Sequence, residues 1–370
     1  MTQIMTPPKR VNWWNVELES MPHFEEAMQR VYAWYEGQVL DRPPVRFMST
    51  LYTPTLSNKP HPADNPKVVW YDVEFRVESY LQSIEGHIFL GETFPFFYPF
   101  LGVDSYAAFY GAELTYDNFT SWSAPFVHDW DDLSRLNLDL AANETFIKVE
   151  ELTNFALERC QGKSLVGYTS LHPGIDCAAA WRGFEQLCID MVYEPDKVKE
   201  LIDIALADFQ HIFDHYNAML SAKNNPSLSW MAVPSFETMH IPGCDFATLI
   251  SPNFFEKFIL PALQIEVRVA KKNIFHVDGA GVARHLDAIF ELPEVNAIQW
   301  AQGAGANRPI MQWIPLIKKI QAHRPVIVDL SAAELESFMA EMKPDGLFLW
   351  VGSEDKEEQQ AILQRLKHWR

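Results

Sequence analysis

An imidazole and a carboxylate stand two residues apart in the run Phe275-His276-Val277-Asp278-Gly279. Residues at positions i and i+2 of an extended chain point to the same side, so His276 and Asp278 face one direction. A polar pair at the end of a buried strand is costly unless it is hydrogen-bonded or used in chemistry. The spacing therefore predicts acid–base catalysis or metal binding here, with a structural hydrogen-bonded pair as the alternative.

Eight short apolar runs have strand character, and helical patterns separate most of them. Buried strands that alternate with helices indicate parallel βα units, and eight units predict an α/β fold of the (β/α)₈ TIM-barrel type. A doubly wound sheet is disfavoured because no GxGxxG turn follows the first run. The runs are residues 45–51, 86–91, 164–169, 228–233, 273–275, 297–300, 326–329 and 346–351.

Two kinds of segment lie outside this repeating pattern. Residues 1–41 are predicted to form an N-terminal helical extension with one amphipathic helix at 23–40, and residues 42–370 a single barrel domain. Long βα insertions are expected at 94–131 and 234–250, and such insertions usually shape an active site. Whether residues 94–131 close as a lid is left open.

Polar residues follow every predicted strand, where barrel enzymes carry their chemistry. Asp329 and Ser353 each precede a predicted helix, so we expect them to cap those helices. The alternative for the other candidates is a structural role: the polar residues would anchor loops, and the tryptophans would pack in the core. Catalytic candidates are His276, Asp278, Glu92, Asp245 and Glu237; substrate-binding candidates are Trp122, Trp300, Gln302, His240, His172 and Trp230; candidate metal ligands are His276, Asp278, His240 and Cys244.

Composition excludes several classes of partner. The 370 residues carry a net charge of −19 without a run of Lys or Arg, which argues against nucleic acid and anionic membranes as partners. No apolar segment approaches the roughly 20 residues that span a bilayer, so a cytoplasmic protein is expected. The four cysteines lack CxxC spacing and are expected to be buried thiols.

Several short motifs stand out along the chain. They are His276-Val277-Asp278-Gly279, Arg284-His285-Leu286-Asp287, Asn296-Ala297-Ile298-Gln299-Trp300 with Gly303-Ala304-Gly305, Cys244-Asp245-Phe246, Ser251-Pro252-Asn253-Phe254-Phe255 with Pro261, Leu101-Gly102, Gly111-Ala112, and Thr120-Ser121-Trp122. Through these motifs the chain resembles the uroporphyrinogen decarboxylase (URO-D) superfamily, which includes corrinoid-dependent methyltransferases, and the resemblance covers most of residues 45–365. The resemblance implies a (β/α)₈ barrel. It also implies either cofactor-free tetrapyrrole decarboxylation or methyl transfer between corrinoids and thiols or methyl donors, often with zinc.

This chain departs from both branches of the superfamily. Arg42 and Arg46 are present, but the Gly-Arg-Tyr context of the decarboxylases is missing. His276-x-Asp278 stands where the zinc methyltransferases carry His-x-Cys, and Ser353 falls near the position of their later thiolate. Oxygen ligands in place of thiolates indicate either a metal other than a thiolate-bound zinc or a site without a metal.

Three functions follow from this pattern. The first is a methyltransferase-like or demethylase-like activity on a small methylated substrate, with a corrinoid protein as partner and a divalent metal as an open question. The second is a decarboxylase of the uroporphyrinogen type, in which a carboxylate such as Asp278 protonates the carbanion-like carbon. The third is a non-catalytic or carbohydrate-binding barrel, because aromatic and acidic residues gather at the predicted mouth.

Overall fold

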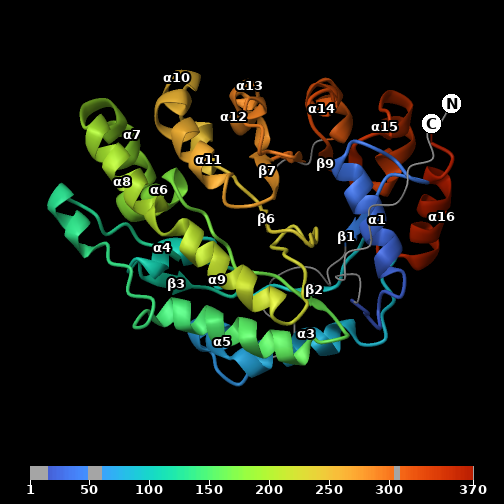
Figure 1. Ribbon diagram of the computed structural model, residues 1–370, viewed down its shortest axis with the longest axis horizontal. Coiled ribbons are helices and arrows are strands. Elements are labelled where there is room, and N and C mark those ends of the chain that lie inside the picture. The colour runs from blue at the N-terminus through green and yellow to red at the C-terminus, as the bar shows by residue number, and fades with distance from the viewer. Residues whose placement is uncertain (1–15, 49–60, 304–308, 370) are drawn as a thin grey trace.

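The computed structural model describes residues 16–48, 61–303 and 309–369 as a mixed α/β protein. Its main sheet is curled, entirely parallel and six-stranded, with the order β1-β10-β9-β8-β7-β6 (Figure 1). The strands are β1 (Val45–Met48), β6 (Met239–His240), β7 (Lys272–Asp278), β8 (Ala297–Ala301), β9 (Val326–Ser331) and β10 (Leu347–Gly352). A separate parallel pair joins β2 (Phe96–Phe97) to β5 (Leu165–Val166).

Irregular segments continue the circle between β1 and β6. Backbone hydrogen bonds run from Glu92 N to Val45 O (2.6 Å), from Leu165 N to Pro95 O (2.9 Å) and from Tyr168 N to Leu228 O (2.9 Å). The predicted closed barrel of eight regular strands is therefore wrong for the described residues. The arrangement is a six-stranded half-barrel completed by short and irregular segments, compatible with a TIM-barrel-like fold.

Two predicted strands are displaced. Residues 86–91 are irregular, with turns at Gly86 (φ +72°) and Gly91 (φ +62°), and β2 begins only at Phe96. Residues 228–233 are not a strand, because Ala232 takes a left-handed conformation (φ +49°) and its N–H bonds Ser229 O. Each run was apolar enough for a strand, but its backbone turns instead.

Helices cover the outside of the half-barrel (Figure 1). Three of the helical patterns in the sequence each form two consecutive helices instead of one. The breaks lie at Asp72 in residues 69–84, at Gly183 (φ +90°) in residues 178–193, and at Asp208 in residues 195–220. The main helices are α1 (Phe24–Tyr35), α2 (Pro66–Tyr71), α3 (Val73–Ile84), α5 (Glu144–Arg159), α6 (Ile175–Arg182), α7 (Phe184–Tyr193), α8 (Pro195–Ala207), α9 (Phe209–Ser221), α11 (Leu260–Glu266), α12 (Gly279–Ala283), α13 (Leu286–Phe290), α14 (Ile314–Gln321), α15 (Leu335–Glu341) and α16 (Lys356–Leu366).

The ends of the last two helices show which residues cap them. Ser331 and Glu334 form a capping box before α15. Asp355, not Ser353, caps α16 by accepting from Glu358 N, while the Ser353 hydroxyl donates to the Glu358 carboxylate. Asp329 lies inside β9 and caps nothing. Both predicted caps are therefore wrong, and Asp329 becomes free for another role.

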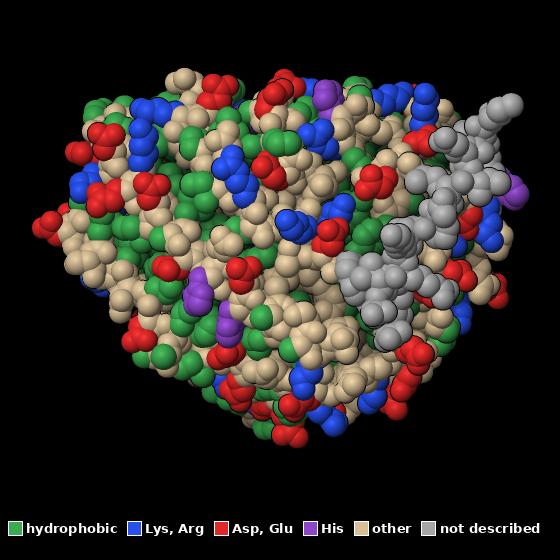
Figure 2. Space-filling model, in the orientation of Figure 1, with side chains coloured by type: hydrophobic (Ala, Val, Ile, Leu, Met, Phe, Trp, Pro, Cys, Tyr) green, Lys and Arg blue, Asp and Glu red, His purple; other side chains and the backbone are tan. Residues whose placement is uncertain are grey.

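Two further observations bear on partners. None of the helices in the described ranges has the length and apolar character needed to cross a bilayer. On the face shown in Figure 2, Lys and Arg side chains lie interspersed with Asp and Glu. That face offers no basic patch for nucleic acid.

Candidate active site

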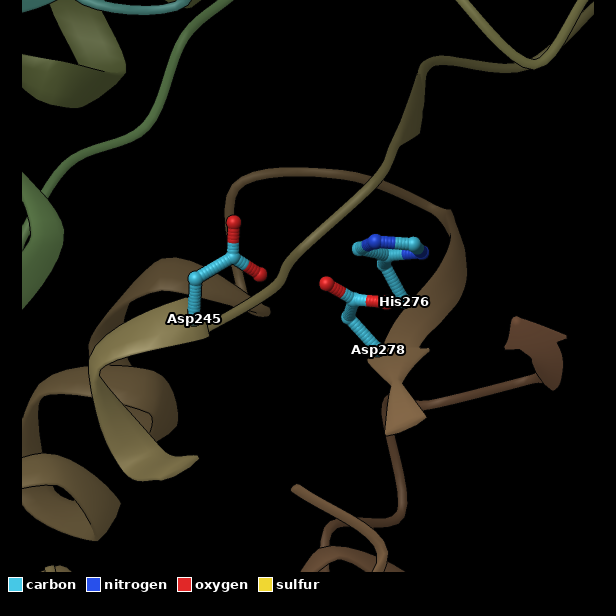
Figure 3. Close-up of side chains that lie close together, drawn as sticks. All are labelled: Asp245, His276 and Asp278. Carbon is cyan, nitrogen blue, oxygen red and sulfur yellow. The ribbon is translucent and has the colours of Figure 1, made fainter. Parts of the chain in front are cut away.

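Three side chains converge at the carboxyl end of β7. His276 and Asp278 project from the same side of the strand, as the i and i+2 spacing predicts. Asp245 approaches from the opposite side, where a 3₁₀ helix (Asp245–Leu249) begins (Figure 3). One ligand atom from each residue lies within 4.8 Å of the other two. We call these three residues the acidic triad.

The orientation of the His276 ring is fixed by its neighbours. Its Nδ1 bonds Oε1 of Gln299, and an amide oxygen only accepts, so Nδ1 carries the proton. In the neutral ring, Nε2 then keeps a lone pair for a proton or a cation. The edge of Trp230 packs against the ring, with centroids 5.1 Å apart and planes at 88°.

The facing loop contacts His276 through its backbone. The backbone N–H of His276 donates to Pro242 O at 2.8 Å, and the next residue, Gly243, forms an isolated bridge with His276. A Cβ on Gly243 would lie 3.4 Å from the His276 Cβ, which is an ordinary van der Waals distance. The backbone contacts of Pro242 and Gly243 with His276 therefore place Asp245 beside β7.

The strand register shows which face of the sheet is the inner one. Arg46 on β1 donates from Nη1 to Met231 O at 2.6 Å, and His276 on β7 packs against Trp230. Since two distant strands reach the same segment, 230–231, both side chains face the inside of the curled sheet. Gln299 pairs with His276 in the register and shares this face.

The same register assigns Trp300 to the outer face. Trp300 is fully buried and packs against Trp313 outside the sheet, with ring centroids 5.0 Å apart. This corrects the expectation that Trp300 lies on a substrate. Gln302 follows β8, and its Oε1 accepts from Trp313 Nε1 at 3.2 Å. Trp122 lies on the hairpin of β3 (Leu114–Tyr116) and β4 (Ser121–Ser123) and is 46 % exposed.

Asp176, in the first turn of α6, supports Asp245, and His172 precedes it in the segment between β5 and α6. Asp176 accepts from the backbone N–H groups of Asp245 and Phe246, each at 3.0 Å. Burial, and then the charge of Asp245, raise the pKa of Asp176 to about 7. Burial lowers the pKa of His172 to about 4, against the opposing effect of Asp245, so His172 is neutral near pH 7. Both residues lie within electrostatic reach of the acidic triad.

His240 and Cys244 do not join the acidic triad. His240 is buried, with Nε2 2.9 Å from Glu266 Oε1 and Nδ1 3.3 Å from the Tyr168 hydroxyl. Burial lowers the pKa of His240 to about 3 and raises that of Glu266 well above its usual range, so both are neutral. Cys244 is buried, and its burial raises the pKa of its thiol. The predicted metal set therefore reduces to His276 and Asp278, with Asp245 as the third member.

Glu92 and Glu237 lie at the other end of the strands. Glu92 is buried beside the first residue of β1, where it accepts from Val45 N (2.7 Å) and binds Arg42 through both oxygens (2.7 and 3.0 Å). Glu237 precedes Thr238, whose carbonyl accepts from Lys271 and Lys272 at the start of β7. The geometry gives neither carboxylate access to the acidic triad.

Two inner-face residues escaped the sequence interpretation. Gln299 orients His276. Asp329 lies in the same row across the sheet as Asp278, because both are in register with Ala301. Gln299 could have been chosen from the sequence, because it lies in the run Asn296–Trp300 that resembles the superfamily. Asp329 was missed because a carboxylate two residues before a capping serine looks like part of the cap.

The side-chain donor atoms of the acidic triad are suitable ligands for a divalent cation. One imidazole nitrogen with a lone pair and two carboxylates are donors that zinc, manganese or iron accept. The bond from Nδ1 to Gln299 is the orienting contact that metal-binding histidines usually have. Thiolate ligands are absent from this group of side chains. The residues that would hold such an ion are His276, Asp278 and Asp245.

Comparison with known proteins supports the fold. No family model matches the chain, and no curated protein matches it. Among solved structures, the chain is similar to a methyltransferase from Methanosarcina mazei, with a TM-score of 0.57 and 13 % sequence identity, over 92 % of this chain and 98 % of that one. At this identity the likeness shows a shared fold and no more.

Proposed function

We propose that this chain is an enzyme that moves a methyl group between a small methylated substrate and a corrinoid carried by a partner protein. The observation that carries the proposal is the acidic triad, in which the side chains of His276, Asp278 and Asp245 converge at the carboxyl end of β7. The structural similarity to a protein described as a methyltransferase supports the same reaction class. The resemblance of residues 45–365 to the URO-D superfamily points in this direction too.

The residues of the acidic triad fit the charge changes of such a transfer. In such a transfer the bond from the methyl carbon to the substrate heteroatom would break, and the electron pair of that bond would stay on the heteroatom. The electron pair of the new bond would come from the reduced corrinoid. A heteroatom that leaves as an anion, as from a methyl ether, a thioether or methanol, then needs a proton, which His276 supplies from Nε2 when its ring is protonated. A quaternary ammonium donor leaves as a neutral amine and needs no proton. Asp278 and Asp245 stabilise the imidazolium and orient it. A divalent cation bound by the same three residues would supply positive charge beside the heteroatom.

The direct test is methyl transfer to free cob(I)alamin under reducing conditions. Donors of different chemistry (methylated amines, thioethers, methanol and methoxyarenes) are offered in turn, and the absorbance of methylcobalamin is followed. The proposal expects enzyme-dependent product from at least one donor, with loss in Asp278→Asn and retention in Asp203→Asn, an exposed aspartate on α8. If no donor class is used, methyl transfer is excluded.

Decarboxylation is the second candidate, and Arg46 favours it. Its guanidinium is buried on the inner face, where it would bind a substrate carboxylate. The acidic triad opposes this function because it repels a polycarboxylate. Incubation with uroporphyrinogen and analysis of the porphyrin products decides between them: loss of carboxyl groups would support the decarboxylase, and unchanged substrate removes its tetrapyrrole form.

Elemental analysis tests the metal separately from the reaction. We expect a stoichiometric divalent metal in the purified protein and its loss in Asp278→Ala. If neither protein carries metal after growth and dialysis in metal-supplemented buffer, His276 acts by proton transfer alone. The methyl-transfer assay then proceeds without added metal.

A further inference from the structure

A second polar group lies on the inner face of the sheet, away from the acidic triad. Arg46, Trp350 and Asp329 are paired across β1, β10 and β9 in the strand register. Asp278 pairs with Ala301, which follows Trp300, and Trp300 pairs with Val328, next to Asp329. One row across the sheet is therefore formed by Arg46, Trp350, Asp329, Ala301 and Asp278. Since Arg46 faces the inside, Trp350, Asp329 and Asp278 face it as well.

Two neighbouring side chains of this row hold polar atoms without partners in the described part of the protein. The Oδ1 atom of Asp329 is buried and accepts no hydrogen bond, and the Nε1 atom of Trp350 is buried and donates none. Trp350 is only 5 % exposed. Buried polar atoms are normally hydrogen-bonded, so two buried atoms without hydrogen bonds on adjacent strands indicate a ligand group that bonds to both.

The Trp350 indole ring is held in place rather than loose. The guanidinium carbon of Arg46 lies 4.7 Å from its ring centroid, and Arg46 is anchored to Met231 O at 2.6 Å. A cation over an indole face is a favourable contact, stronger when shielded from water. The indole ring is therefore held in a fixed place on the strand next to Asp329.

The unmet atoms define the chemistry of the missing partner. Asp329 offers an acceptor and Trp350 a donor, and a hydroxyl group both donates and accepts. An ammonium group would satisfy only Asp329, and a carboxylate would satisfy only Trp350. We propose that Asp329 and Trp350 recognise a hydroxyl group on the methylated substrate, an inference that rests on the proposed function for the location of the methyl group. Burial raises the pKa of Asp329 to about 6, so the carboxylate is ionised at pH 8 and accepts strongly.

The strand spacing sets the size of such a substrate. Asp329 lies two strands from Asp278, which places the Cα atoms roughly 10 Å apart, and inward-pointing side chains shorten the gap. The transferred methyl group and the hydroxyl group would thus stand a few bonds apart. Choline and 4-methoxyphenol have this character. Ethyltrimethylammonium and anisole are matched partners that lack only the hydroxyl group.

Binding of these two pairs tests the proposal by isothermal titration calorimetry at pH 8. We expect the hydroxyl member of at least one pair to bind the wild-type protein about tenfold more tightly, as one charge-assisted hydrogen bond implies. Asp329→Leu and Trp350→Phe should each reduce that ratio to near one, whereas Asp329→Asn, which keeps an acceptor, should retain part of it. Asp203→Leu, on the exposed side of α8, is the matched control.

Three outcomes would overturn the proposal. They are no binding of any probe, equal affinity of the wild-type protein for both members of both pairs, and an unchanged ratio in Asp329→Leu. Circular dichroism confirms folding, and Trp350→Phe supplies the answer if Asp329→Leu does not fold. Because binding needs no turnover, failure here with methyl transfer intact removes only the hydroxyl site. Failure of methyl transfer with this selectivity intact removes only the proposed reaction.

Discussion

The two sides of the half-barrel are built differently. From β7 through β10 to β1, long parallel strands are paired in continuous register and bury most of their side chains. From residue 89 through β6 to residue 249, the parallel strands β2, β5 and β6 are each two residues long and irregular segments separate them. The regular side supplies His276, Asp278 and Asp329 from fixed rows, and the irregular side brings Trp230 and Asp245 against them.

On the irregular side, side chains take over part of the hydrogen bonding that a sheet would provide. Asn225 bonds both backbone groups of Val166, through Oδ1 at 2.9 Å and Nδ2 at 2.8 Å. Thr93 Oγ1 accepts from Phe47 N at 2.9 Å, and Ser227 Oγ accepts from Met239 N at 3.0 Å. Backbone groups satisfied in this way need no regular partner strand. The irregular side can therefore be shaped for a ligand without losing its hydrogen bonds.

The largest effect is expected on the regular side, from His276→Ala. Removing the group that delivers the proton should lower the rate of methyl transfer by about 10²–10⁴-fold. The melting temperature should change little, because the ring is only partly buried. His211→Ala, on an exposed position of α9, is the control. A rate within threefold of the wild-type value would remove His276 from the reaction.

Glu92→Gln tests the junction between the two sides. Glu92 holds Arg42 and the first residue of β1, so its loss leaves a buried guanidinium without a counter-charge. We expect unfolding in urea to show a loss of about 3 kcal/mol. Glu26→Gln removes an exposed partner of Arg30 and should cost under about 1 kcal/mol. Equal effects of the two changes would mean that the buried pair does not secure the junction.

Asp245→Asn measures what the irregular side adds to the chemistry. The side chain keeps its size and loses its charge, so the effect on the rate of methyl transfer should be about 10–100-fold, smaller than that of His276→Ala. Steady-state rates with any active donor give the comparison. Should Asp245→Asn be as damaging as His276→Ala, the regular side would not dominate the site.

The smallest effect is expected in the dependence of stability on pH. Burial raises the pKa of Asp329 from 3.8 to about 6. Its contribution to stability is therefore full below pH 3.8 and is lost as the pH rises through about 6. Asp329→Asn lacks this loss, so relative to the wild-type protein it should gain on the order of 1–2 kcal/mol between pH 4 and pH 8. Urea melts at both pH values measure it, and parallel pH profiles would show that Asp329 has an ordinary pKa.

The sequence predicted the regular side well and the irregular side poorly. The runs at 273–275, 297–300, 326–329 and 346–351 became β7 to β10 because β-branched and aromatic residues fill both buried faces. The runs at 86–91 and 228–233 were equally apolar, but Gly91 and Ala232 turn the backbone there. Apolar content alone does not reveal a left-handed residue.

The candidate site divides in the same way. The spacing of His276 and Asp278 was sufficient to place both on one face of a strand. The position of Asp245 depends on the loop at Gly243 and on two hydrogen bonds to Asp176. These contacts join segments that are distant in the sequence, so no local sequence pattern predicts them. Trp300 was misplaced because an odd or even position in a strand decides its face, and the register was unknown until the strands were paired.

The central claim is that side chains from both sides form one reaction site, and a double-mutant cycle tests it most directly. The rate of methyl transfer to cob(I)alamin is measured for the wild-type protein, His276→Ala, Asp245→Asn and the double variant. If Asp245 acts through the imidazole, the double variant should be no slower than His276→Ala by more than about twofold. Losses that multiply in full would show that the two residues act independently, and would contradict a single site.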